Sequence, residues 1–361
     1  MISEQRIFQA YYTNSEPIVN YMVELLDLNG SETIFEPCAG EGVFLDPILD
    51  KYKTVKVDAF ELNPNAYKKL KKKYFDFDNV SVKLTDTLTD IDLDLLLGLN
   101  NGKYDAIIAN PPYGAWRNIE GRASLKKRFN GFYAKESYSL FLYRCIELLN
   151  EGGKLVFIIP DTFLNLNMHK SLRKYILTNT KIKEISLFPS SYFPGVNFGY
   201  ANLSIIALEK HINISSNYDN VLNIYKGYKS VDELGKNKLR HLTKLSFYQK
   251  DVLNDDGHIF LTNKNKNISD AIRNTATSIG DICDCATGFY SGNDKERLKV
   301  LNKSIRNSKR YDVVDKNKIT YNCISMPFDG IKTKKIYVPI VKGGNVKYFK
   351  EDNWFMNWSA E

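Results

Sequence analysis

The sequence of 361 residues lacks any apolar run near the roughly 18 residues that a membrane-spanning helix requires. Its first 13 residues contain no apolar core of the kind that a secretory signal carries. The five cysteines are odd in number and form no Cys-x-x-Cys pair, which favours reduced thiols in a cytoplasmic protein. These absences argue against a membrane protein and against a secreted, disulfide-bonded one.

Negative charge is also in deficit. The chain has 50 Lys and Arg against 42 Asp and Glu, a net charge of +8, with a sequence pI near 8.9. Residues 281–361 hold 15 basic and 10 acidic residues, so more than half of the surplus lies in the last quarter. This balance fits a nucleic-acid partner without proving one.

Strand-like and helix-like segments alternate over residues 1–210. Short apolar runs that alternate with helices predict a mostly parallel sheet covered on both faces, an α/β Rossmann-like fold. The expected strands are 32–37, 55–62, 80–86, 104–110, 154–161, 182–188 and 201–210. The expected helices are 17–28, a segment from about Val43, 65–75, 137–150 and 169–177.

The pattern changes after about residue 211. Residues 211–275 are polar, with short alternating strands, and we interpret them as a β-rich connector. Residues 276–361 contain glycines, aromatic residues and many basic residues, and we expect a smaller, partly β segment there.

Polar residues stand at the carboxyl ends of four predicted strands, where open α/β sheets bind their ligands. In chain order these ends are Glu36-Pro37-Cys38-Ala39-Gly40-Glu41-Gly42, then Glu61, Asp86 and Asn110-Pro111-Pro112-Tyr113.

The first two ends indicate a nucleoside ligand. Gly40 and Gly42 let the backbone approach a ligand, and Glu61 follows Gly42 at about the 20-residue interval at which an acid meets a ribose. A nicotinamide-binding loop would need a third glycine where Leu45 stands, and Glu36 would repel a pyrophosphate.

A cationic nucleoside without phosphates, S-adenosylmethionine (AdoMet), fits this pattern better. Asp86 is then a candidate acceptor for the adenine amino group of AdoMet. Taken alone, a glycine loop is more often a tight turn, and a single acid at a strand end is more often a helix cap.

The fourth strand end predicts the chemistry. The lone pair of an amino group on a base is delocalised into the ring, so two acceptors on its N–H groups favour the nucleophilic, pyramidal nitrogen. The Asn110 side-chain oxygen supplies one acceptor and the Pro111 carbonyl the other, while Tyr113 stacks on the base. No strong base and no metal are required. The alternative is a Pro-Pro turn in which Asn110 caps a helix.

With these motifs in order, the chain resembles the gamma-class amino-methyltransferases of DNA, the TaqI-like adenine methylases of type II restriction–modification systems. The resemblance covers residues 8–210 and rests on "YYTNSEPIVNYMVELL", "FEPCAGEGVFL", "FELNP", "TDTL" and "ANPPYG". It implies a catalytic turn formed by Asn110, Pro111, Pro112 and Tyr113. It implies AdoMet binding by Thr13, Glu36, Cys38, Gly40, Gly42, Glu61, Asp86 and Asn110.

The resemblance also implies double-stranded DNA as substrate, with the target adenine flipped out of the helix. In the family a phenylalanine before a late strand stacks on that base. Phe193 is our candidate for this role and Phe198 is its rival, although both could be core residues.

Two segments are candidates for DNA contact. Residues 114–135 form a basic, glycine-containing stretch beside the catalytic motif, and we expect a loop that clamps the DNA backbone or is simply solvated. Its candidate DNA-binding residues are Arg117, Arg122, Lys126, Lys127 and Arg128. Residues 276–361 resemble the start of a target-recognition domain, which is usually longer in the family.

The sequence therefore predicts an adenine-specific DNA methyltransferase, with a catalytic domain at 1–210, a connector at 211–275 and a target-recognition segment at 276–361. A restriction or specificity subunit is a candidate partner. One alternative is a protein glutamine methyltransferase, which shares the Asn-Pro-Pro-Tyr motif but usually places a helical domain first. Another is a DNA-recognition subunit without activity, which the intact Asn110–Tyr113 motif disfavours.

Overall fold

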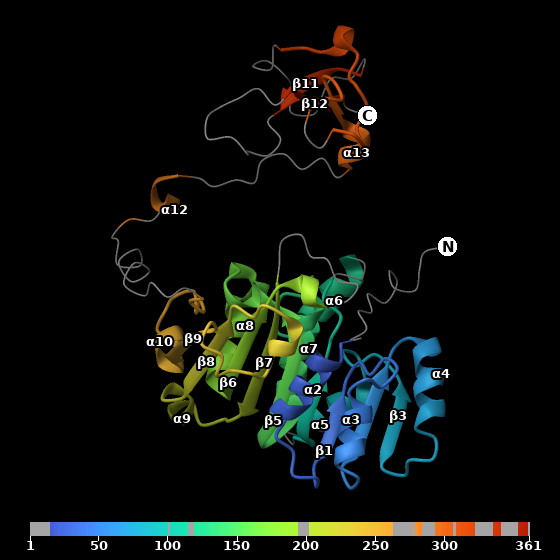
Figure 1. The fold of residues 1–361 in the computed structure, drawn as a ribbon, viewed down its shortest axis with the longest axis vertical. Coiled ribbons are helices and arrows are strands. Elements are labelled where there is room, and N and C mark those ends of the chain that lie inside the picture. The colour runs from blue at the N-terminus through green and yellow to red at the C-terminus, as the bar shows by residue number, and fades with distance from the viewer. Residues whose placement is uncertain are drawn as a thin grey trace. The chain divides into compact units, whose positions relative to one another are not determined.

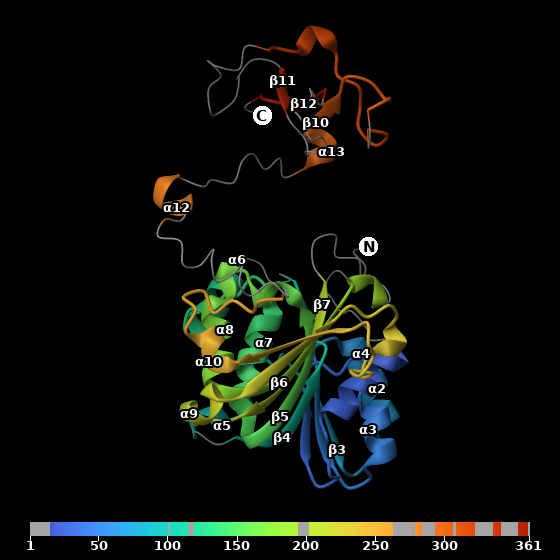
Figure 2. The same ribbon diagram turned by 60° about the vertical axis from the view of Figure 1, so that its left-hand side comes forward.

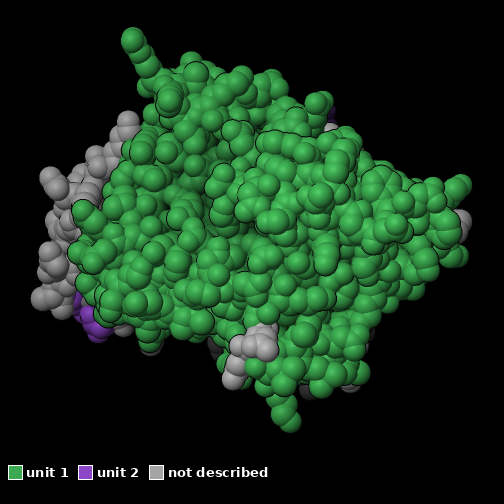
Figure 3. Space-filling view, turned by 90° about the horizontal axis from the view of Figure 1, so that it is seen from below, with its two compact units in different colours: residues 1–271 green, residues 272–361 purple. Residues whose placement is uncertain are grey.

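The computed structural model describes residues 15–99, 102–114, 119–193, 202–262, 277, 279–283, 293–305, 308–321, 335–340 and 353–359. The chain divides into two compact units, Met1–Ala271 and Ile272–Glu361, which Figure 3 distinguishes by colour. Among the described residues, no helix combines the length and the apolar character needed to cross a bilayer.

The first unit is built on a nine-stranded sheet of order β3-β2-β1-β4-β5-β7-β6-β8-β9 (Figure 1). Strands β3, β2, β1, β4 and β5 are mutually parallel, and β7 runs antiparallel between β5 and β6. The strands are β1 Thr33–Glu36, β2 Lys56–Glu61, β3 Val80–Leu84, β4 Tyr104–Ala109, β5 Leu149–Pro160, β6 Thr180–Phe188, β7 Leu203–Lys210, β8 Val221–Lys226 and β9 Thr243–Tyr248.

Helices cover both faces of this sheet. Figure 2 shows α2, α3 and α4 on one side and α5, α7 and α8 on the other. The helices of this unit are α2 Glu16–Leu25, α3 Leu45–Lys51, α4 Pro64–Lys73, α5 Ile91–Gly98, α6 Ile119–Arg128, α7 Ser137–Leu148, α8 Lys170–Asn179, α9 Ile214–Tyr218 and α10 Gln249–Leu253. Short 3-10 turns are η1 Asp161–Leu164, η2 Asn167–His169, η3 Ser190–Tyr192 and η4 Val231–Glu233.

The apolar runs of the sequence become the buried centre of the sheet. Ile107, Ile108 and Ala109 of β4 are fully buried, as a strand covered on both faces requires. Phe35 of β1 stacks on Tyr104 of β4, with ring centroids 4.6 Å apart. The seven strands that the sequence predicts within residues 1–210 all form, and the predicted Rossmann-like α/β fold is confirmed.

Residues 211–271, most of the expected connector, belong to the first unit, and two strands within 221–248 extend its sheet. Strand β8 pairs parallel with β6, and β9 pairs antiparallel with β8. The fully buried Gln249 ties this extension to the core, because its amide accepts from the Ile182 N–H at 2.7 Å and donates to the carbonyls of Leu177 and Thr180, both at 3.0 Å. The division of the chain by function stays a prediction.

The second unit contains a three-stranded antiparallel sheet of order β10-β12-β11. Tyr311 and Trp354 pack edge to face in its small core, with ring centroids 4.8 Å apart. Its elements are α12 Ile279–Ile282, α13 Asp294–Arg297, β10 Leu298–Val300, η5 Lys316–Lys318, β11 Tyr337–Ile340 and β12 Trp354–Asn357.

Candidate functional site

Four strand ends meet at one edge of the sheet, where the strand order reverses between β1 and β4. Strand β1 pairs in parallel with β2 on one side and with β4 on the other, so the connections leave in opposite directions. Such a switch point opens a crevice beyond the carboxyl ends of the strands. Glu36 and Glu61 end β1 and β2, Asn110 directly follows β4, and Asp86 lies two residues beyond β3. The topology thus brings together the four strand ends that the sequence singles out.

Hydrogen bonds join these ends to one another. The Ala39 N–H donates to the Phe60 carbonyl at 2.9 Å, which joins the loop after β1 to the end of β2. The Thr87 hydroxyl donates to the Pro37 carbonyl at 2.5 Å, and the Cys38 thiol donates to the Asn110 carbonyl at 3.3 Å. The loops that follow these strands are therefore connected to one another by hydrogen bonds.

Glu36 is the least satisfied charged group at this edge. Its side chain is 1% exposed, and its Oε2 atom has no hydrogen-bond partner among the described residues. Burial raises the pKa of Glu36 well above its usual range, and the neighbouring Glu61 and Asp46 carboxylates raise it further. A buried carboxylate with a spare oxygen is suited to receive a cation or a strong hydrogen-bond donor.

Glu61 is held in a fixed orientation. One carboxylate oxygen accepts from the Gly40 N–H at 2.7 Å, and the other accepts from the Asn63 N–H at 2.6 Å. Burial raises the pKa of Glu61, although backbone N–H groups, with that of Asn63 foremost, oppose the rise. Because each carboxylate oxygen has a second lone pair, Glu61 retains the capacity to accept hydroxyl groups from a ligand.

The two loop glycines are required for different reasons. Gly40 has a φ of +56°, and its N–H binds Glu61. Gly42 has a φ of +82°, and a Cβ atom there would lie 2.7 Å from the Tyr74 ring and 2.9 Å from Leu70. Both side chains belong to the α4 region, so packing of the loop against this helix is sufficient to explain Gly42.

Asp86 lies in a turn and is half-buried. Its Oδ1 atom accepts from the Leu88 N–H at 3.0 Å. The preceding Thr85 N–H donates to the Glu61 carbonyl at 3.0 Å, which joins this turn to the end of β2. Asp86 therefore stands next to Glu61 along the edge, in the order that the sequence predicts.

The Asn110–Tyr113 turn is held from two sides. Cys38 bonds the Asn110 carbonyl, as described above, and the Ser137 hydroxyl is shared between the carbonyls of Pro112 at 2.8 Å and Gly114 at 3.0 Å. Tyr113 is 3% exposed and Asn110 is half-buried. Sequence reasoning did not identify Ser137. Its only sequence signal is a serine at the start of a largely apolar helix, a signal that Ser139 shares.

The basic segment after this turn is partly helical, so the expectation of a loop over residues 114–135 is wrong for residues 119–128. Helix α6 forms there because Leu125 and Phe129, four residues apart, are buried at 2% and 3% exposure. Gly121 and the run of basic residues conceal this apolar pair in the sequence.

The predicted DNA-binding residues of this segment differ in their surroundings. Lys126 and Lys127 are exposed, and Arg122 is half-exposed. Arg128 forms an ion pair with Asp94 of α5, whose other carboxylate oxygen binds the buried Arg144 at 2.8 Å. Arg128 therefore has a structural partner, and Arg117, like the predicted cofactor residue Thr13, lies outside the described residues.

Phe193, our candidate for base stacking, is 1% exposed and belongs to the core of the first unit. Its N–H donates to the Ser190 carbonyl at 3.0 Å. Its rival Phe198 lies outside the described residues. Stacking by Phe193 on a base would require the ring to leave the core, and this role stays a prediction.

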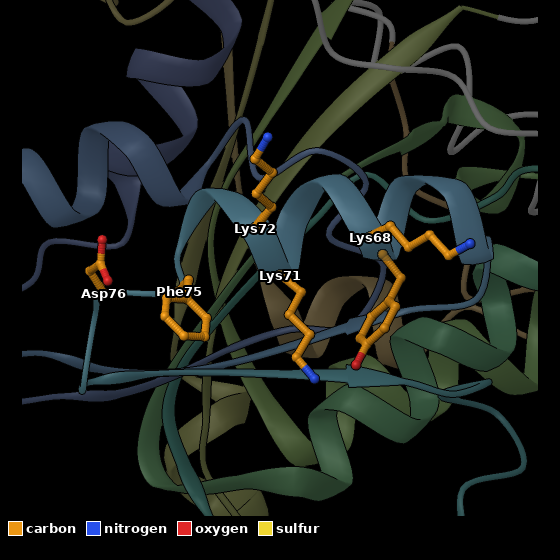
Figure 4. A pocket seen from close by; sticks show the side chains of 6 residues that line it. Lys68, Lys71, Lys72, Phe75 and Asp76 are labelled. Atoms are coloured by element: carbon orange, nitrogen blue, oxygen red, sulfur yellow. The ribbon is translucent and has the colours of Figure 1, made fainter.

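An open surface depression of about 420 Å³ lies elsewhere, on helix α4 (Figure 4). Figure 4 shows Lys71 and Phe75 pointing to the same side of the helix. None of its lining residues is a predicted site residue; they are Tyr67, Lys68, Lys71, Lys72, Phe75 and Asp76. Within the described part of the chain, no cluster of three or more His, Cys, Asp or Glu residues could hold a metal.

The sequence is similar to restriction–modification methylases. Residues 22–193, just under half of the chain, match the family model described as Eco57I restriction-modification methylase. The type II methyltransferase M.AccI of Acinetobacter calcoaceticus is 25% identical over 333 residues, which cover 80% of this chain and 60% of that protein. M.HindII of Haemophilus influenzae is 26% identical over 321 residues, which cover 82% of this chain and 56% of that protein.

The resemblance that the sequence predicts is therefore confirmed. The modification methylase CviBIII of Paramecium bursaria Chlorella virus NC1A is 30% identical over 185 residues, 49% of this chain and 43% of that protein. The chain spans at most 60% of the length of these relatives.

Solved structures agree on the fold. A modification subunit of a putative type I restriction enzyme from Vibrio vulnificus aligns with a TM-score of 0.53 at 15% identity, over 66% of this chain and 55% of that one. The methyltransferase subunit of a type I restriction-modification system from Streptococcus thermophilus also aligns with a TM-score of 0.53. Its identity is 17%, and the alignment covers 69% of this chain and 58% of that one. The first unit thus has the Rossmann-like methyltransferase fold.

The loop packing at Gly42 leads to a stability prediction. Gly42→Ala combines a strained positive φ with a clash against buried Tyr74 and Leu70, and we expect a cost of roughly 2–4 kcal/mol in the free energy of unfolding. Urea denaturation measures this cost.

Gly152→Ala is the matched control, because its φ is +76° and no atom lies within 4 Å of the added Cβ. Gly152→Ala should lower the free energy of unfolding only through the strain of its positive φ, by roughly 1–2 kcal/mol. Equal losses in the two variants would contradict the packing role of Gly42.

Proposed function

We propose that the chain transfers a methyl group from AdoMet to the exocyclic amino group of an adenine in DNA, within a restriction–modification system. One observation carries this proposal. The Asn110–Tyr113 turn lies at the switch point of the sheet, bonded through Cys38 to the loop that follows the buried, unsatisfied carboxylate of Glu36. The similarity to named type II methyltransferases supports the same conclusion.

The residues at this edge fit AdoMet. The spare oxygen of Glu36 would accept from the ammonium group of the methionine part, and this contact would compensate for its burial. The remaining lone pairs of Glu61 would accept the ribose hydroxyls. Asp86, next along the edge, would accept from the adenine amino group of the cofactor. Thr13, which lies outside the described residues, belongs to the proposed set through the family resemblance.

AdoMet supplies an electrophilic methyl group on a positively charged sulfur. The protein's part is to place a weak nucleophile in line with that group and to stabilise the charge that develops on it. The Asn110 side-chain oxygen and the Pro111 carbonyl would accept the two N–H bonds of the target amino group. Both acceptors gain strength as positive charge grows on the nitrogen, so they act in the transition state more than in the ground state.

The target base must leave the DNA duplex to reach this turn. Tyr113 and either Phe193 or Phe198 are the proposed stacking residues, and Lys126, Lys127 and Arg122 remain candidates for contact with the DNA backbone. Phosphate contacts of this kind contribute affinity and orientation but little sequence preference.

We assign sequence recognition to residues 276–361, all of which belong to the second unit. The adenine specificity rests on the family arrangement of the motifs. A restriction or specificity subunit remains a candidate partner, as the type I modification subunits with the same fold suggest.

Glu36 provides a test of cofactor binding. Its pKa lies well above the ordinary value of 4.5, so the free protein keeps a proton on this carboxyl above pH 4.5. Binding an ammonium group favours the carboxylate. AdoMet binding should therefore release a proton, and affinity should rise as the pH increases through the raised pKa of Glu36. Titration calorimetry in two buffers of different ionisation enthalpy measures this release.

Glu36→Gln should abolish the proton release and weaken AdoMet binding by roughly 10- to 100-fold, the size of one charge-assisted hydrogen bond. Glu41→Gln is the control, because Glu41 lies in the same loop but is exposed and pairs with Lys69 at 2.7 Å. Proton release that persists in Glu36→Gln would show that another group receives the ammonium.

A substitution at Asn110 tests the proposed mechanism of methyl transfer. Asn110→Ala removes one of the two acceptors, and we expect methyl transfer to DNA to fall by roughly 100- to 1,000-fold or more. The AdoMet dissociation constant should stay within about threefold, because the cofactor contacts lie mainly on β1 and β2. Transfer of labelled methyl to DNA measures the rate, and equilibrium binding of AdoMet measures the dissociation constant.

Asn79→Ala serves as control for this variant. The Asn79 amide donates to the Val55 carbonyl at 2.8 Å at the opposite edge of the sheet, so its loss should not affect transfer. An Asn110→Ala protein that keeps most of its transfer rate would overturn the proposed mechanism.

A further inference from the structure

Three carbonyl groups in the Asn110–Gly114 turn receive side-chain hydrogen bonds from outside the turn. The Asn110 carbonyl accepts from Cys38, and the carbonyls of Pro112 and Gly114 accept from Ser137. Pro111 lies between these held carbonyls and is buried. Among the described residues, no hydrogen bond to the Pro111 carbonyl is found.

This arrangement matters because the turn has few means of holding itself. Pro111 and Pro112 have no N–H groups, so they cannot donate the backbone hydrogen bonds that fix an ordinary turn. The proline ring fixes φ, but the direction of a carbonyl also depends on ψ. Donors from outside the turn must therefore hold the peptide groups on either side of Pro111 if its carbonyl is to keep one direction.

We infer that Cys38 and Ser137 are positioning residues, which hold the flanking carbonyls so that the Pro111 carbonyl keeps one direction toward the substrate amino group. This inference rests on the proposed function. Cys38 belongs to the loop after β1, and Ser137 is the first residue of α7. The turn is therefore held on one side by the proposed cofactor loop and on the other by helix α7.

A polar network that includes the buried Tyr138 and His169 supports Ser137. Glu136, the residue before it, binds the ring of His169 at 2.8 Å, and His169 also binds the Tyr138 hydroxyl at 3.0 Å. The Tyr138 hydroxyl in turn lies 3.0 Å from the hydroxyl of Thr162, just beyond β5. These contacts fix the first turn of α7 relative to the end of β5, so the Ser137 hydroxyl has a defined position.

The chain offers a matched control for Ser137. Ser139 lies two residues further along the same helix and is equally buried, at 1% exposure against 3%. Its hydroxyl also reaches two carbonyls, those of Tyr133 at 2.8 Å and Glu136 at 2.7 Å, but it does not contact the turn. Ser137→Ala and Ser139→Ala therefore remove similar bonds, and only the first bears on the turn.

In the full-length protein, Ser137→Ala should lower the rate of DNA methylation at saturating AdoMet by roughly 10- to 100-fold through misplacement of the Pro111 carbonyl. The AdoMet dissociation constant should change little. Ser139→Ala should keep a rate near that of the wild type, even if both variants lose similar thermal stability. At the other contact, Cys38→Ser should retain more activity than Cys38→Ala, since the hydroxyl can still donate.

Hydrogen exchange gives a readout that does not depend on activity. The amides of residues 108–110, 113 and 114 should exchange faster in Ser137→Ala than in the wild type, by roughly tenfold for the turn, and should be unchanged in Ser139→Ala. Equal exchange or equal rate losses in the two variants would overturn the inference. If the wild type itself fails to methylate DNA, the proposed function fails, and the exchange comparison still decides whether Ser137 holds the turn.

Discussion

The parallel pairing of β1 with both β2 and β4 is the constraint on which the rest of the site depends. Because the strand order reverses at β1, the loops after β1 and β4 leave the sheet side by side and in opposite directions. Without this reversal, Cys38 could not reach the Asn110 carbonyl, and the loop after the buried Glu36 would not be bonded to the Asn110–Tyr113 turn. The pairing of the central strands thus determines which chemical groups share this edge of the sheet.

The site combines groups that the protein holds through hydrogen bonds with a buried Glu36 carboxyl oxygen that has no such partner among the described residues. Glu61, Pro112 and the Asn110 carbonyl have hydrogen-bond partners within the protein, which gives the edge a defined shape before any ligand arrives. Glu36 has a buried oxygen without such a partner, and its raised pKa reflects the free energy cost of burying that charge. A cationic ligand would relieve this cost, which provides selectivity as well as affinity.

Sequence reasoning located the strand ends because short apolar runs there stop at glycine, proline or acidic residues. Glu36, Glu61 and Asn110 could be placed at one edge from the order of the elements alone. Helix α6, the pairing of the connector strands β8 and β9 with the main sheet, and the contact between Ser137 and Pro112 were missed. Each depends on contacts between distant or weakly patterned residues, which local periodicity does not record. Gly42 was attributed to ligand approach, whereas its contact with Tyr74 provides a sufficient reason.

The central claim is that the amino group held by the Asn110–Tyr113 turn belongs to adenine in DNA. The most direct measurement incubates the protein with labelled AdoMet and genomic DNA, digests the DNA to nucleosides and identifies the labelled species. The account predicts label on the exocyclic nitrogen of adenine. Label on cytosine would contradict the base assignment, and label on protein alone would contradict DNA as the substrate.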